Sequence, residues 1–185
     1  MSDPEAAVPR GTALYPGVVQ VHFDGACEPP RGGGIATYGF TVEGEGLDFE
    51  ERGLAVRPGV PHATNNVAEY TGAIRALEWL RSQQYAGAVI VYGDSQLVIR
   101  QMTGEYAVRT AHLEAYHEHL LTLARSFSEV RFAWIPRREN GRADELTKLA
   151  IAEAREEAAG PTAREEPGPR DTFEPGRPGK PPSPP

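Results

Sequence analysis

The segment VVQVHFDGA, residues 18–26, decides the fold of this 185-residue chain. Apolar side chains alternate along it, with Val19, Val21 and Phe23 on one face, which is typical of a β-strand with one buried side. Asp24 closes the alternation, and a glycine follows it. Polar groups at strand ends lie at an edge of the sheet, where α/β proteins bind their ligands. The segment therefore predicts a strand that carries a carboxylate to such an edge.

Three more acidic residues stand where secondary structure is expected to change. Glu69 lies near the start of a helix predicted for residues 65–84, and Asp144 lies in the first turn of one predicted for 141–157. Asp94 directly follows the apolar run AVIVYG. If these carboxylates converge, each pair of like charges at ~4 Å costs roughly 4 kcal/mol at an effective dielectric constant near 20. Such a cluster needs cations, and hard oxygen ligands favour Mg²⁺ or Mn²⁺. The pattern therefore predicts metal-assisted phosphate chemistry.

Each acid also has a purely structural explanation. Asp24 and Asp94 are ordinary turn or cap residues when taken singly, and Asp144 at a helix start interacts favourably with the helix dipole. Glu69 is able to complete a capping box with Asn66, three positions earlier. Because all four acids occupy positions that converge in an α/β sheet, we interpret them as one site.

The remaining periodicity predicts the order β-β-β-α-β-α-α-β-α. Three antiparallel strands followed by alternating helices and strands indicate an α/β fold with a five-stranded mixed sheet, in which the last two strands are parallel and helices cover both faces. The strands are expected over residues 18–24, 35–43, 47–56, 88–93 and 130–135. The helices are expected over residues 65–84, 95–103, 110–127 and 141–157.

The two ends of the chain differ in composition from residues 17–157. Residues 158–185 contain nine prolines and four glycines and end in PPSPP. Such a segment cannot bury enough apolar surface to offset its ordering entropy, so we expect a disordered, proline-rich tail. Residues 1–16 are expected to be disordered as well. Residues 17–157 form the expected domain, which is long enough for a core.

The net charge of −7 argues against strong nucleic-acid binding, because Lys and Arg contacts to phosphates supply most of the affinity. Four of the negative charges are the proposed metal ligands, however, and two divalent cations would cancel them. The single cysteine, Cys27, excludes an intramolecular disulfide. No segment has the pattern of a signal peptide or a membrane span. We therefore expect a soluble, monomeric, cytoplasmic protein that does not bind membranes.

Four motifs appear in an order that is typical of a known family. They are FDGAC at 23–27, TNNVAEY at 64–70, GDSQ at 93–96 and ENGRADEL at 139–146. On these motifs the chain resembles ribonuclease H of type I over about residues 18–155. The resemblance implies the ribonuclease H-like fold and an endonuclease that hydrolyses the RNA strand of RNA/DNA hybrids. It also implies that four carboxylates hold two Mg²⁺ ions, which Mn²⁺ is able to replace: Asp24, Glu69, Asp94 and Asp144.

The resemblance also implies contacts with a hybrid substrate. RNA differs from DNA at the 2′-hydroxyl, which both donates and accepts hydrogen bonds, so side-chain amides and backbone groups are suited to read it. Thr64 matches a family position that contacts a phosphate of the DNA strand. The family positions that line the minor groove match Gly25, Cys27, Asn65, Asn66 and Gln96. Helix capping is the alternative for Asn65 and Asn66, and a solvated helical turn is the alternative for Gln96.

Two departures from the family pattern place the chain in a subset of type I enzymes. Many members carry a histidine between the last strand and the last helix, but here the connection is PRRENG, residues 136–141. Arg137 or Arg138 occupies this region, and arginine cannot act as a general base near neutral pH. We expect Arg138 to contact a phosphate, with covering of the strand end as the alternative. The second departure is a missing lysine-rich handle, since residues 104–110 contain one arginine and no lysine.

Other functions remain open at this stage. Another nuclease on the same fold, acting for example on double-stranded RNA, would use the same acidic residues. A non-catalytic hybrid-binding module is disfavoured, because a pure binder gains nothing from repulsive charge in its groove. The proline-rich tail is also able to dock in the aromatic groove of a protein partner, although an inert, solubilising extension is favoured over this.

Overall fold

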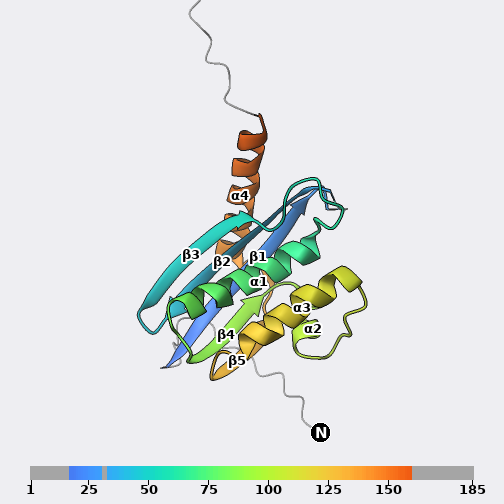
Figure 1. Cartoon of the computed structure of the whole chain (residues 1–185). Coiled ribbons are helices and arrows are strands. Elements are labelled where there is room, and N and C mark those ends of the chain that lie inside the picture. Colours follow the sequence, from blue (N-terminus) through green and yellow to red (C-terminus); the bar gives the residue numbers. More distant parts are fainter. Residues whose placement is uncertain (1–16, 31–32, 160–185) are drawn as a thin grey trace, which may run out of the picture.

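The computed structural model describes residues 17–30 and 33–159 (Figure 1). The expected order of strands and helices is confirmed, with one added turn of 3-10 helix, η1. The elements are β1 (Val18–Glu28), β2 (Ile35–Gly44), β3 (Leu47–Leu54), α1 (Asn65–Ser82), β4 (Ala88–Gly93), α2 (Gln96–Met102), α3 (Ala111–Ala124), β5 (Glu129–Trp134), η1 (Arg137–Glu139) and α4 (Gly141–Ala159).

The five strands form one mixed sheet, as the sequence predicted, and the structure adds their spatial order, β3-β2-β1-β4-β5. β1 pairs antiparallel with β2 and parallel with β4, and β4 pairs parallel with β5. In the β1–β4 register, Phe23 is the partner of Gly93. Because the two strands run in the same direction, the next residue of each, Asp24 and Asp94, reaches the same end of the sheet.

β1 is longer than predicted. The alternation of apolar residues stops at Asp24, but the strand continues to Glu28. Its last residues pair with the start of β2, where Cys27 is the partner of Ala36. β4 has already ended at this level, so no strand of the described residues pairs with this edge of β1 beyond Phe23. Asp24 therefore lies inside a strand, at the point where its parallel neighbour stops, rather than at a strand end.

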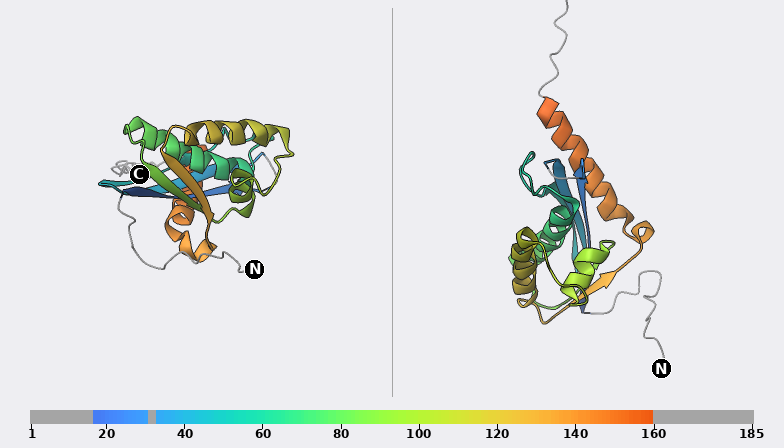
Figure 2. Two further views of the ribbon diagram at one scale, coloured as in Figure 1. Left: turned by 90° about the horizontal axis from the view of Figure 1, so that it is seen from below. Right: turned by 90° about the vertical axis from the view of Figure 1, so that its right-hand side faces the viewer.

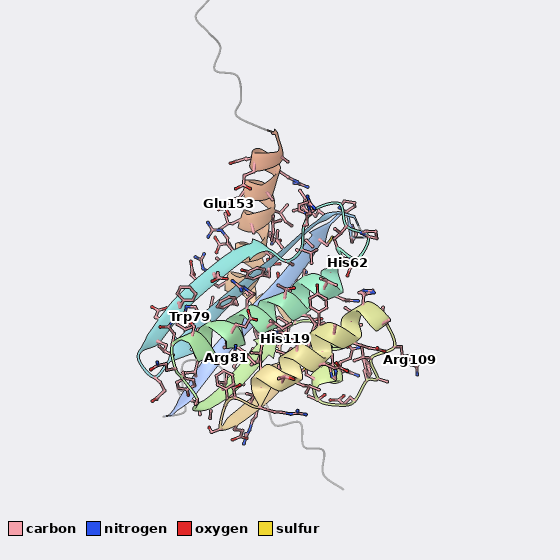
Figure 3. All side chains as sticks on the ribbon, in the orientation of Figure 1. His62, Trp79, Arg81, Arg109, His119 and Glu153 are labelled. Atoms are coloured by element: carbon pink, nitrogen blue, oxygen red, sulfur yellow. The ribbon has the colours of Figure 1, made fainter. Side chains whose placement is uncertain are left out.

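Helices cover both faces of the sheet (Figure 2). α1 and α3 lie on one face and α4 on the other, as seen when the sheet is viewed edge-on. The face towards α1 carries the alternating residues of β1, and Val19, Val21 and Phe23 are fully buried there. On the other face, α4 is tied to β3 by Glu153, which accepts a 2.6 Å hydrogen bond from Nη2 of Arg52 (Figure 3).

The predicted ends of the domain lie close to the first and last residues that the structure describes. α4 continues through Ala159, two residues past the predicted end of the domain at 157. The expected disorder of residues 1–16 and of the tail from 160 onward concerns residues outside those the structure describes. Within residues 17–30 and 33–159, no helix combines the length and apolar character needed to cross a bilayer.

Gly39 on β2 allows α4 to lie close to the sheet. A Cβ atom at this position would be 2.5 Å from Cβ of Leu146 and 2.9 Å from the backbone oxygen of Ala143. Both contacts are with the first two turns of α4, which carry Asp144. The missing side chain therefore sets the distance between the sheet and this acidic residue.

We expect Gly39→Ala to lower the free energy of unfolding by about 1–3 kcal/mol, because overpacking forces α4 and β2 apart. Urea denaturation followed by circular dichroism measures this change. Gly141→Ala is the matched control, since a Cβ there would meet nothing within 4 Å. Equal stability of the two variants would contradict the proposed role of Gly39.

Candidate active site

Three acidic side chains from separate parts of the chain share one pocket. Asp24 of β1, Glu69 of α1 and Asp94 after β4 each place a carboxylate oxygen within 4.8 Å of the others. They meet at the end of the sheet where β4 stops and α1 begins. The predicted convergence is therefore observed for these three residues.

Gly25 allows Glu69 to approach Asp24. A Cβ on Gly25 would lie 2.1 Å from the backbone nitrogen of Glu69 and 2.3 Å from the carbonyl carbon of Ala68. No side chain fits in this space, so the first turns of α1 pack directly on the backbone of β1. The close approach of helix and strand is what brings two carboxylates from different layers together.

α4 and the residue before it hold two of the carboxylates in place. The hydroxyl of Thr147 lies 2.7 Å from Oδ2 of Asp24, which is only 3% exposed. Asn140 donates from Nδ2 to the backbone oxygen of Phe23 at 2.8 Å and to Oδ1 of Asp94 at 3.2 Å. The sequence analysis did not identify Thr147 or Asn140 as site residues. The available signal was a polar side chain within four residues of Asp144, either on the helix that was expected to reach the site or directly before it.

Asp94 is also fixed through its backbone. Trp134, at the end of β5, donates from Nε1 to the carbonyl oxygen of Asp94 at 3.1 Å. The indole is 46% exposed, so this hydrogen bond lies at the surface beside the acidic pocket. The side chain and the backbone of Asp94 are thus held by different elements, which limits its freedom to turn outward.

Glu69 contains a buried oxygen that lacks a protein partner. Its Oε2 has no hydrogen bond among the described residues although it is removed from solvent. A buried carboxylate oxygen without a partner is costly, unless a cation or a proton compensates its charge. Together with the oxygens of Asp24 and Asp94, this atom provides a set of hard ligands of the type that Mg²⁺ and Mn²⁺ prefer. The residues present therefore fit a divalent metal ion.

Burial and mutual repulsion raise the pKa of two of the carboxyls. Burial raises the pKa of Asp24 to about 6, with smaller contributions from the charges of Asp94 and Asp144, and the hydrogen bond from Thr147 opposes the shift. The pKa of Glu69 is raised well above its ordinary value, first by burial and then by the charges of Asp24 and Asp94. These groups titrate as a set, and the pocket favours positive charge.

Asp144 differs from the other three acids, because both of its carboxylate oxygens bind cationic side chains. Arg137 of η1 donates to Oδ1, and Lys148 donates to Oδ2 across 2.5 Å from one turn further along α4. Burial alone would raise the pKa of Asp144, but the hydrogen bonds from Lys148 and Arg137 together lower it. Its charge still reaches the pocket, where it contributes to the raised pKa of Asp24.

The predicted substrate residues at the start of α1 differ in their exposure and in their role in the helix. Thr64 is the N-cap of α1, and its Oγ1 accepts from the backbone nitrogen of Val67 at 3.3 Å. Asn65 is exposed and Asn66 half-buried in the first turn. The alternative in which Asn66 caps the helix together with Glu69 is wrong, since Thr64 holds that position.

The other predicted contacts lie on separate elements. Gln96 is exposed at the start of α2, and the side chain of Arg138 is 73% exposed in η1. The thiol of Cys27 is buried, and its sulfur lies 3.1 Å from the backbone oxygen of Ala63. Any contact between Cys27 and a substrate would therefore come from its backbone.

Comparison with known proteins places this arrangement in a family. Residues 52–150 match the family model described as reverse transcriptase-like. Ribonuclease HI of Halobacterium salinarum is 34% identical over 140 residues, which cover 75% of this chain and 66% of that protein. Ribonuclease H of Bradyrhizobium diazoefficiens is 32% identical over 156 residues and 92% of its length is covered. The chain belongs to the type I ribonuclease H family.

Solved structures agree with this assignment. The Halobacterium salinarum RNase H1 structure has a TM-score of 0.65 at 32% identity, covering 74% of this chain and 99% of that one. LC11-RNase H1, solved in complex with an RNA/DNA hybrid, has a TM-score of 0.66 at 32% identity, covering 75% and 99%. The chain spans only 27% of the bifunctional Mycobacterium tuberculosis protein, to which it is 35% identical over 100 residues. The resemblance predicted from the four motifs is confirmed.

We expect Asp24→Asn to stabilise the cation-free protein at neutral pH. Because the pKa of Asp24 is about 6 in the folded state against an ordinary 3.8, the folded state binds this proton more tightly. The contribution of Asp24 to the free energy of unfolding therefore falls by on the order of 2–3 kcal/mol as the pH rises from about 4 to 6. Above pH 6 it stays at this lower value. The variant should gain most of this energy at pH 7.5 and little at pH 4.

Urea denaturation in the presence of a chelator at both pH values measures this effect. The matched control is Asp48→Asn, which removes an exposed acid of β3 from the same protein. Addition of Mg²⁺ should stabilise the wild type more than Asp24→Asn. A gain that is equal at the two pH values would contradict the electrostatic explanation.

Proposed function

We propose that this protein is an endoribonuclease that hydrolyses the RNA strand of RNA/DNA hybrids with two divalent cations, Mg²⁺ in the first place and Mn²⁺ as a substitute. The observation that carries the proposal is the cluster of Asp24, Glu69 and Asp94, whose carboxylate oxygens lie within 4.8 Å of one another and which includes a buried Glu69 oxygen without a partner among the described residues. The names of the relatives, and the hybrid bound to LC11-RNase H1, support this choice of substrate.

Asp24, Glu69, Asp94 and Asp144 would hold the cations. When bound, a pair of divalent ions activates a water molecule and stabilises the leaving oxygen of a phosphodiester. The chain's own contribution is to position charge. Thr147 orients Asp24 and Asn140 orients Asp94, so that the carboxylates are preorganised before any ligand arrives.

Polar groups around the pocket would bind the hybrid. The exposed amides of Asn65 and Gln96 lie in the first turns of α1 and α2, at positions suited to the donor and acceptor of a 2′-hydroxyl. Asn66 and the backbone of Gly25 and Cys27 would complete this surface. The hydroxyl of Thr64 accepts a hydrogen bond from Val67, so its own proton would be available to donate to a phosphate oxygen.

Arg138 provides a further phosphate contact in the proposal. Its side chain is 73% exposed and bonds only weakly to its neighbour Glu139, at 3.4 Å. A guanidinium in this state is free to pair with a phosphate in a bidentate manner. The monomeric state, the cytoplasmic location and a partner for the proline-rich tail stay predictions.

We expect Asp94→Asn to lower the rate of hybrid cleavage by roughly a thousandfold while the fold is retained, because the variant keeps the shape and loses the charge. The assay uses a labelled hybrid with Mg²⁺ or Mn²⁺, beside double-stranded RNA and DNA of the same sequence. Asp48→Asn serves as the control with an unchanged rate. Cleavage that survives Asp94→Asn or a chelator would contradict the mechanism, and equal cleavage of double-stranded RNA would contradict the substrate choice.

We also expect hybrid binding to be weak and sensitive to salt. The connection between α2 and α3 contains Arg109 and no lysine, so few phosphates are neutralised there. With about two or three phosphate contacts, affinity should fall roughly 10- to 40-fold between 50 and 200 mM salt. Fluorescence anisotropy with the inactive Asp94→Asn protein measures this. An affinity that barely changes with salt would contradict the prediction.

A further inference from the structure

Arg137 occupies a distinctive place beside the acidic pocket. Its guanidinium donates to Oδ1 of Asp144, and this is the only hydrogen bond of its side chain among the residues that the structure describes. Its side chain is 69% exposed, whereas that of Asp144 is 13% exposed. A single ion pair to a mostly buried carboxylate therefore holds an otherwise solvated side chain in place.

The charge of Arg137 also acts on the other acids. It lowers the pKa of Asp24 and of Glu69, and the negative charges of Asp24 and Asp94 raise the pKa of Arg137 in turn. The pKa values of these acids respond more to Arg137 than to Lys148, the second partner of Asp144. The charge of Arg137 is therefore shared between Asp144, to which it is hydrogen-bonded, and the neighbouring acids.

No similar cation neutralises the remaining carboxylates. Within residues 17–30 and 33–159, no lysine or arginine forms an ion pair with Asp24, Glu69 or Asp94. A divalent ion that binds these three has no protein cation to displace. A divalent ion that uses Asp144 has to compete with a side-chain cation at either oxygen, the guanidinium of Arg137 at Oδ1 or the ammonium of Lys148 at Oδ2.

We propose that Arg137 is the counter-ion of Asp144 in the cation-free protein and competes with a divalent cation for this carboxylate. The inference rests on the proposed function, since it concerns the same cation-binding site. It makes the two cation positions unequal: the group of Asp24, Glu69 and Asp94 fills first, and the position that includes Asp144 fills at a higher concentration. Because arginine stays charged at any working pH, the competition does not depend on deprotonation.

The expected size of the competition follows from the exposure of the pair. Ion pairs with a solvated partner contribute little, so removal of Arg137 should tighten cation binding at Asp144 by about three- to tenfold. Arg137→Gln keeps the length and polarity of the side chain and removes its charge. Arg131→Gln on β5 is the matched control, since Arg131 is 70% exposed and pairs with Glu129 away from the pocket.

Calorimetric titration of Mn²⁺ into the full chain, without nucleic acid, tests the proposal. Wild type and Arg131→Gln should show the same weak second binding event, and Arg137→Gln should show it tightened by about three- to tenfold. In the double variant Arg137→Gln/Asp144→Asn this gain should disappear. Circular dichroism checks that each variant is folded.

Two outcomes would overturn the inference. One is an unchanged second binding event, or none, in Arg137→Gln. The other is a gain that persists in the double variant, because it would show that Arg137 acts through long-range charge rather than as the counter-ion of Asp144. Failure of the proposed function has a different signature: wild type that binds Mn²⁺ and does not cleave the hybrid, or Mn²⁺ binding that is unaffected by Asp24→Asn.

Discussion

The mutual repulsion of three clustered carboxylates, one buried and two half-buried, is the constraint on which the rest of the structure depends. Asp24, Glu69 and Asp94 place oxygens within 4.8 Å of one another, and one oxygen of Glu69 has no partner among the described residues. At such distances each pair of charges opposes folding, and burial adds to the cost. The cluster persists because the core beneath it fixes the backbone from which each side chain extends. Its unfavourable charge in the free protein is also what makes it selective for cations.

Close backbone contacts bring the carboxylates together. Gly25 lets α1 lie against β1, and Gly39 lets α4 lie against β2, so that groups from two opposite layers meet at the end of the sheet. α4 then orients what these contacts have assembled, through Thr147 on Asp24 and through the preceding Asn140 on Asp94. One helix therefore supplies an acidic residue and a hydrogen bond that orients another. A shift of α4 would affect at least three of the four carboxylates at once.

The fourth carboxylate is electrostatically separate from the other three. Arg137 and Lys148 satisfy both oxygens of Asp144, which lowers its pKa, while burial raises the pKa of Asp24 and Glu69. The connection between β5 and α4, residues 136–141, contains arginines and lacks the histidine of the family pattern. A guanidinium cannot exchange protons near neutral pH, so its contribution at this position is charge and hydrogen bonding. The acidic site thus combines three carboxylates whose charge no side-chain cation of the described residues neutralises, those of Asp24, Glu69 and Asp94, with a fourth, Asp144, that is neutralised by two.

The sequence by itself determined the order of the strands and helices, the mixed sheet and the family, because apolar periodicity and short motifs are local properties of the chain. It also pointed to the four acids, since each stands where the local pattern of apolar residues changes. Tertiary structure alone decided that β1 continues past Asp24, that Thr147 and Asn140 orient the carboxylates, and that Asp144 is paired with Arg137. The bonds from Thr147 to Asp24 and from Asn140 to Phe23 join residues 123 and 117 positions apart. Contacts of this kind depend on how whole layers pack, and no local pattern records them.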